Sequence, residues 1–191
     1  MTDAFDAERW RAELEAKRTE KDEFFAEHPQ SPVPPGEREE FEGVAYFEPD
    51  PAYRVSAAVD RDVDPEEPVL METTAGREVR YVRASRLAFE VPSSTGERRS
   101  LTLTAYHQDE RDRTLFVPFR DKTTGQQTYA GGRYMELTVE GDLTDGAELV
   151  LDFNLAYTPF CAYSETFDCP LPPEENWLEV AIAAGERLER A

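Results

Sequence analysis

The stretch YRVSAAV (residues 53–59) alternates apolar and polar side chains with a period of two residues. The runs LAFEV (87–91) and LTLTA (101–105) repeat this alternation, and turn-forming sequences rich in Gly, Pro, Asp and Thr separate such runs. Because successive side chains of a β-strand point to opposite faces, each run predicts a strand with one buried face. Further strands are predicted at residues 68–72, 79–82, 114–119, 134–140, 148–154 and 178–183. The sequence therefore predicts a mainly β fold: a single antiparallel β-barrel or sandwich of about nine strands over residues 43–191.

The N-terminal segment follows a helical periodicity instead. Its apolar residues recur at helical spacing on one face, which predicts a long N-terminal α-helix at residues 3–27 with Thr2 or Asp3 as its cap. We expect this segment, residues 1–28, to pack by its ends on the β domain, because lysines interrupt the apolar face in the middle. Residues 29–42 read as a proline-rich linker. A lid over the core is favoured over an oligomerisation arm, because a sustained heptad repeat is absent.

The balance of charges is strongly acidic. The chain of 191 residues has 41 acidic and 21 basic residues, which gives a formal net charge of −20, and only three of the basic residues are lysines. The acidic residues are spread along the chain, a pattern typical of a protein adapted to high salt. An acidic surface for a basic partner is the alternative interpretation. Nucleic acid is not expected as a partner, because no basic patch stands out that would neutralise phosphates.

Two further features bear on location. The sequence has no apolar run of the length needed to span a membrane, and MTDAFDAERW (1–10) lacks the pattern of a signal peptide. We therefore expect no membrane partner and a cytoplasmic location, where cysteines are usually reduced.

The block TYAGGRY (128–134) is the first candidate for ligand contact. Its adjacent glycines allow the backbone to approach another group closely, and Arg133 between Tyr129 and Tyr134 is a planar donor beside aromatic rings. Such a set can hold a carboxylate or phosphate by two parallel hydrogen bonds, which predicts a compact anionic ligand. The alternative is a buried Arg133–Asp121 pair that holds the preceding turn in place.

A second group of candidate residues follows at the end of a predicted strand. Asp152 and Asn154 lie two residues apart and share one face of that strand. If they are buried they must be hydrogen-bonded, because an unpaired buried polar group costs about 1–3 kcal/mol. They are therefore either members of a polar network or site residues, and Asn154 and Tyr157 join the predicted ligand-binding set.

The two cysteines leave several interpretations open. Cys161 and Cys169 are too far apart in sequence for a zinc knuckle, so no metal site is predicted. They are buried inert thiols, a disulfide or redox pair, or residues with a metal-binding or nucleophilic role. A Cys161–His107 dyad would require a spatial proximity that the sequence does not establish.

Four blocks of the chain resemble one protein family. They are GVAYFEPDPAYRVSA (43–57), FRDKTTGQQTYAGGRY (119–134), LDFNLAYTPFCAY (151–163) and CPLPPEENWLEVAIAAGER (169–187). These blocks are similar to the bacterial and archaeal family known as domain of unknown function 1684 (DUF1684), and the low lysine content resembles a haloarchaeal member. The matching positions are Asp121, Thr123, Gly125, Tyr129, Gly132, Arg133, Tyr134, Asp152, Phe153, Asn154, Tyr157, Pro159, Cys161, Tyr163 and Cys169. Trp177 departs from the family pattern, which more often has a basic residue there. The resemblance implies no activity, and the cofactor, the substrate class and the oligomeric state stay open.

Three hypotheses about function follow. The favoured one is a small-molecule-binding β-barrel with Tyr129, Arg133, Tyr134, Asn154 and Tyr157 at its mouth. The second is an enzyme that uses the Cys161 thiol or the Asp121 and Asp152 carboxylates. The third is a protein–protein interaction module that presents the N-terminal helix.

Overall fold

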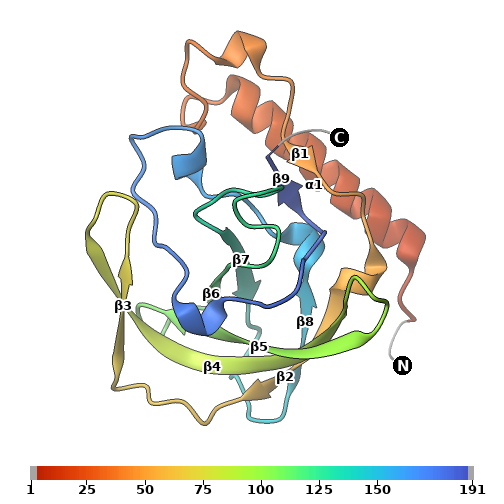
Figure 1. Ribbon diagram of the computed structural model, residues 1–191, viewed down its shortest axis with the longest axis vertical. Helices are drawn as coiled ribbons and strands as arrows, with labels where there is room; N and C mark the ends of the chain where they lie inside the picture. The colour runs from red at the N-terminus through yellow and green to blue at the C-terminus, as the bar shows by residue number, and fades with distance from the viewer. Residues whose placement is uncertain (1–3, 189–191) are drawn as a thin grey trace.

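The structure is a computed structural model of the chain and describes residues 4–188. Within these residues it has one long helix, α1 (Ala7–Glu27), and nine strands in two antiparallel sheets (Figure 1). The strands are β1 (Ala45–Tyr46), β2 (Arg54–Asp60), β3 (Pro68–Glu72), β4 (Glu78–Pro92), β5 (Arg98–His107), β6 (Thr114–Phe119), β7 (Arg133–Thr138), β8 (Glu148–Asp152) and β9 (Glu186–Arg187). Short 3-10 helices lie at Arg38–Glu40, Pro51–Tyr53, Phe153–Leu155, Phe160–Ala162 and Glu174–Asn176. The predicted mainly β fold with a long N-terminal helix is confirmed.

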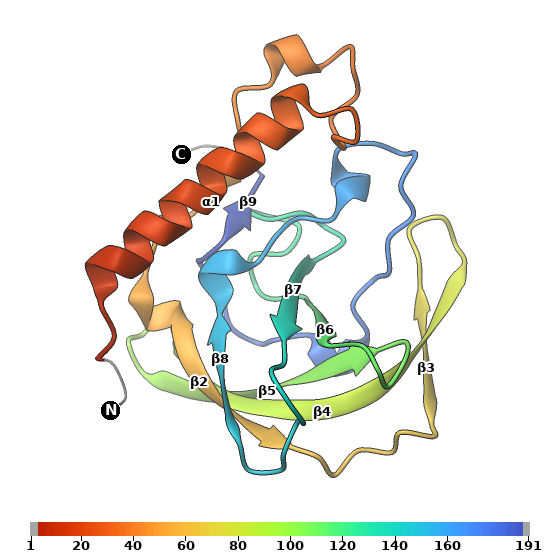
Figure 2. The same cartoon turned by 180° about the vertical axis from the view of Figure 1, so that it is seen from behind.

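The larger sheet curls into a half-barrel. Its strand order is β7-β6-β5-β4-β2-β8, and β3 pairs with the first part of β4. Figure 2 shows the curled β4 and β5 at one end of the molecule and α1 lying across the other. The two end strands approach each other where the Tyr134 and Tyr157 main chains exchange hydrogen bonds of 2.9 Å in both directions. This bridge links β7 to the segment that follows β8.

The core follows from the two-residue alternation. In β2, Val55, Ala57 and Val59 are buried, while the residues between them are exposed. They pack with the inward side chains of β4 and β5, including Leu87 and Leu103, in one continuous cluster inside the half-barrel. Burial of this apolar surface is the main stabilising contribution to the sheet.

Strand β4 combines two of the predicted strands. Residues 79–82 and 87–91 belong to one strand of 15 residues, with a register shift between Arg83 and Ser85. A β-bulge of this kind bends a strand and increases its local twist. The bend lets one half of β4 pair with β3 and the other half with β2.

The prediction of a strand at residues 178–183 is wrong, because this segment forms no regular strand. The segment runs beside the end of β6, where the Leu178 amide donates to the Arg120 carbonyl (2.7 Å) and the Lys122 amide donates to the Val180 carbonyl (2.9 Å). Leu178, Val180 and Ile182 still alternate inward and belong to the core. The alternation correctly predicted their burial, but the main-chain bonds are too few for a strand. The last strand is β9, which pairs with β1.

Helix α1 begins after Asp6, whose carboxylate accepts hydrogen bonds from the amides of Glu8 and Arg9, both at 3.1 Å. The caps predicted at Thr2 and Asp3 lie outside the described residues. The helix ends at Glu27, ahead of Pro29, as expected for a residue that cannot continue a helix. No helix within residues 4–188 combines the length and the apolar character needed to cross a membrane.

Helix α1 is attached to the barrel mainly through polar contacts. Only two of its 21 residues are buried, Leu14 and Phe25. The Trp10 indole donates to the Asp152 carboxylate (2.8 Å), and Arg18 donates to the Phe47 carbonyl (3.2 Å). Contacts in the middle of the helix correct the expectation that it packs by its ends alone.

The proline-rich segment 29–42 folds back onto α1. Val33 is buried and joins Phe25 and Val44 in a second, smaller apolar cluster. The Ser31 hydroxyl donates to the Phe25 carbonyl, and Arg38 donates to the Val33 carbonyl (3.0 Å). The segment thus connects the C-terminal end of α1 to the β domain through packed contacts.

Candidate functional site

Arg133 lies at the start of β7 and is 1% exposed. Its guanidinium donates to the Asp121 carboxylate (3.2 Å) and to the main-chain carbonyls of Ile182 (2.8 Å), Ala184 and Glu186 (3.1 Å). Desolvation by burial lowers the pKa of Arg133, and the neighbouring carboxylates of Asp121 and Glu186 oppose this shift. This is the arrangement given above as the alternative to ligand contact: the guanidinium holds residues 182–186 against β7.

The turn that follows β6 supports this ion pair. Asp121 accepts hydrogen bonds from the hydroxyls of Thr123 (2.8 Å) and Thr124 (3.1 Å) and from the Ile182 amide (2.6 Å). Gly125 adopts φ 79°, a positive value that glycine adopts without strain. The Asp121 carboxylate is therefore saturated with protein donors.

The two glycines before Arg133 allow neighbouring parts of the protein to pack closely against the main chain. Gly132 has φ 87°, and a Cβ atom there would lie 2.7 Å from the Phe119 carbonyl oxygen. A Cβ at Gly131 would lie 2.5 Å from the Tyr129 ring. The absence of side chains at these two positions thus allows close contact with the end of β6 and with the Tyr129 ring, and not with a ligand.

Asn154 belongs to a buried polar network and is 2% exposed. Its amide nitrogen donates to the Asp50 carbonyl and to the Asp152 carboxylate, both at 2.9 Å, and its oxygen accepts from the Asp50 amide (2.9 Å). Asp152 also accepts from Trp10 of α1. The network attaches the turn before β2 and the helix to the end of β8.

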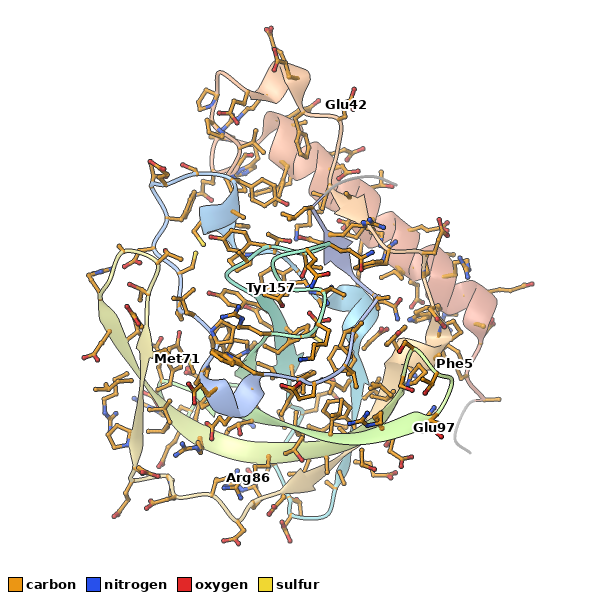
Figure 3. The ribbon with its side chains drawn as sticks, in the orientation of Figure 1. Phe5, Glu42, Met71, Arg86, Glu97 and Tyr157 are labelled. Carbon is orange, nitrogen blue, oxygen red and sulfur yellow. The ribbon has the colours of Figure 1, made fainter. Side chains whose placement is uncertain are left out.

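Tyr134 and Tyr157 meet at a cavity of about 610 Å³ between α1, β7 and the segment after β8. We call it the helix-side pocket. The label of Tyr157 in Figure 3 marks its place near the centre of the molecule, below α1. Six aromatic residues line the pocket together with Pro159, Lys21, Glu136, Asp168 and Cys169; the aromatic ones are Phe24, Phe25, Tyr134, Tyr157, Phe160 and Phe167. The structure therefore brings two of the predicted ligand-binding residues together, and places Arg133 and Asn154 elsewhere.

Lys21, which lines the helix-side pocket, forms an ion pair with Glu186, which is not one of the lining residues. The Lys21 ammonium contacts the carboxylate of Glu186, which is 2% exposed and also accepts from the Thr158 amide (2.8 Å). The same ammonium lies 5.0 Å from the ring centre of Tyr157 and 5.3 Å from that of Phe25. Such cation–π contacts stabilise a charge in a partly apolar environment.

The tyrosine hydroxyls of the pocket are engaged in hydrogen bonds. Tyr157 donates to Glu136 (3.1 Å), and Tyr134 donates to the Pro170 carbonyl. Burial raises the pKa of both hydroxyls, so both are neutral donors at ordinary pH. The rings form pocket walls and also contact each other edge to face, with centroids 5.8 Å apart.

The two cysteines are free thiols beside this pocket. The Cys161 sulfur lies 3.7 Å from the Tyr129 hydroxyl, and Cys169 lines the pocket. Burial, followed by the interaction with Cys161, raises the pKa of Cys169 to about 12, so this thiol stays protonated and unreactive at neutral pH. Burial likewise raises the pKa of Tyr129 to about 12.

Cys161 and His107 do not form a dyad. His107 lines a different cavity, where its ring Nδ1 lies 2.8 Å from the Asp109 carbonyl oxygen. In the described part of the chain, no group of three or more His, Cys, Asp or Glu side chains is placed to hold a metal ion.

Sequence reasoning missed several pocket residues, chiefly Lys21, Phe24 and Phe167. One signal was available: Lys21 is one of only three lysines and interrupts the apolar face of the helix. A charge at such a position requires a partner, but only the tertiary structure shows that Glu186 provides it.

The comparisons with known proteins agree with this fold. The family model described as "Protein of unknown function (DUF1684)" matches residues 39–187. The solution NMR structure of an uncharacterized protein from Haloarcula marismortui is 57% identical to the chain, with 96% of each chain covered and a TM-score of 0.71. The search of curated proteins gave no match. The similarity to the Haloarcula protein agrees with the expectation of a haloarchaeal member, and the match over residues 39–187 shows that the chain belongs to the DUF1684 family.

Proposed function

We propose that the protein binds a compact, uncharged organic molecule with an aromatic or aliphatic body in the helix-side pocket. The observation that carries this proposal is the cavity of about 610 Å³ whose walls are mostly aromatic and which is also lined by the Lys21 ammonium. Small-molecule sites in proteins are typically concave, lined by apolar and aromatic side chains, and supplied with a few polar groups that orient the ligand.

The charges of the pocket favour a neutral ligand over the anionic one expected from Arg133. Arg133 is buried, and both of its terminal nitrogens donate to protein acceptors, although its Nε has no hydrogen-bond partner. Among the carboxylates in and beside the pocket, Glu186 pairs with Lys21 and Asp168 pairs with Arg77, while Glu136 accepts a hydrogen bond from the neutral Tyr157 hydroxyl. A ligand carboxylate would meet these negative charges in a partly desolvated site, where like charges repel strongly.

Lys21 is the group that would orient the ligand. Its ammonium has three N–H donors, and Glu186 accepts one of them. A carbonyl or hydroxyl oxygen of the ligand can accept another, while the ligand body lies against the rings of Phe24, Phe160 and Phe167. The pocket thus supplies one directional contact and a large apolar surface.

The test is titration of the protein with N-phenyl-1-naphthylamine, a neutral aromatic fluorophore, in molar KCl. Wild type is expected to bind this probe saturably, and Phe167→Ala to bind it about tenfold more weakly, because a large apolar side chain contributes about 1.5–3 kcal/mol when fully buried. The probe reports the apolar walls directly and does not require the natural ligand.

Tyr81→Ala is the matched control. Tyr81 lies outside the pocket and stacks on Phe116 with centroids 5.4 Å apart, the same separation as in the Phe160–Phe167 pair. Urea denaturation midpoints show that both variants are folded. The proposal is refuted if wild type shows no saturable fluorescence, or if Tyr81→Ala weakens binding as much as Phe167→Ala does.

The two other hypotheses stay predictions with less support. The carboxylates of Asp121 and Asp152, two of the catalytic groups considered, are both engaged by protein donors, which argues against a catalytic role for them. The inward side of α1 is occupied by contacts with the barrel, which limits the helix surface that an interaction module could present.

A further inference from the structure

A second cavity of about 610 Å³ collects four arginines of this acidic chain, and we call it the arginine pocket. The arginines are Arg61, Arg83, Arg111 and Arg113. They come from the β2–β3 connection, from β4 and from the turn between β5 and β6. The β2–β3 and β7–β8 connections lie at the end of the molecule away from α1 (Figure 1). The arginine pocket is therefore distinct from the helix-side pocket.

The local charge balance differs from that of the whole protein. The lining has four arginines and three carboxylates, whereas the whole chain has 21 basic and 41 acidic residues. One of the three carboxylates, Asp112, accepts hydrogen bonds from the amides of Gln108 (3.3 Å) and Asp109 (3.1 Å). The lining is thus richer in arginine than the chain as a whole, although three carboxylates outside the lining, Glu67, Glu175 and Asp109, pair with Arg83 and Arg111.

Two of the arginines have donors available for a ligand. Arg83 and Arg111 are paired with carboxylates. Among the ion pairs of residues 4–188, none involves Arg61 or Arg113. Arg113 uses one nitrogen to donate to the Gly141 carbonyl (2.9 Å), which orients its guanidinium and leaves its other N–H groups for a ligand.

The same pocket also has an apolar part. Val63, Leu115, Val139 and Leu143 contribute to its lining, and Leu115 is 4% exposed. From this combination we infer that the arginine pocket binds a compact oxyanion, a phosphate or carboxylate group carried on a small apolar body. Arg61 and Arg113 hold the anionic group, and the aliphatic side chains cover the body of the ligand.

Direct hydrogen bonds to arginine suit a protein that works in high salt. At about 1 M salt the screening length is only about 3 Å, so long-range attraction or repulsion contributes little. Guanidinium groups can still hold an oxyanion through two parallel hydrogen bonds at contact distance. The net charge of −20 therefore does not prevent binding under such conditions.

The test compares phenyl phosphate with inorganic phosphate, each titrated into the full chain in molar KCl and followed by calorimetry. Wild type is expected to bind phenyl phosphate saturably and more tightly than inorganic phosphate, because the ring contacts the apolar part of the pocket. The double variant Arg61→Gln/Arg113→Gln is expected to lose about tenfold or more in affinity for phenyl phosphate. Both arginines are exposed, so the substitutions are compatible with folding, and urea midpoints check this.

The double variant Arg80→Gln/Arg99→Gln is the control. It changes the net charge equally at exposed positions outside the pocket and should bind phenyl phosphate like wild type. Three results would overturn the inference: no saturable binding of either anion by wild type, equal losses in the two double variants, or equal affinities of wild type for the two anions.

Discussion

Replacing Arg133 by methionine is expected to destabilise the fold by about 3–5 kcal/mol, because Asp121 would remain as a buried carboxylate without its cation. The three carbonyls at residues 182, 184 and 186 would also lose their donor. Urea denaturation in molar KCl measures the free energy of unfolding. Arg99→Met, at an exposed position, is the control and should change it by less than about 0.5 kcal/mol. A loss below about 1 kcal/mol at Arg133 would argue that this ion pair is not structural and would return Arg133 to the ligand-binding candidates.

At the scale of an element, α1 depends on few apolar contacts, and Phe25 is its principal one. Phe25 is 1% exposed and packs against the rings of Phe41, Phe160 and Tyr163. Phe25→Ala is expected to cost about 3–5 kcal/mol, the usual effect of truncating a buried phenylalanine. Phe24→Ala, at the neighbouring half-buried position, should cost clearly less. Equal losses in urea denaturation would mean that the helix is not held by this cluster.

At the scale of the whole molecule, the charge of −20 makes stability depend on salt. Excess surface carboxylates repel one another in the compact state, and this repulsion is screened over about 10 Å at 0.1 M salt but over about 3 Å at 1 M. We expect the thermal midpoint to rise as KCl increases over this range, and to rise similarly with NaCl because screening does not distinguish the two cations. A midpoint that does not change with salt would contradict the interpretation of the charge as an adaptation to high salt.

The sequence by itself determined the fold class and the position of most strands of the larger sheet along the chain. For example, the alternation of apolar and polar residues around Val55, Ala57 and Val59 indicates which face of β2 is buried, because side-chain direction in a strand is a local property of the backbone. The turn at Asp121 and Gly125 is also a local feature, because glycine adopts the positive φ found there without strain. Only the tertiary structure decided that residues 178–183 lack a regular strand, that Arg133 faces Asp121, and that Lys21 meets Glu186 some 165 positions later in the chain. The arginine pocket likewise unites segments that are distant in sequence. Partners and cavities of this kind depend on which segments the curled sheet brings together, and no local periodicity encodes that.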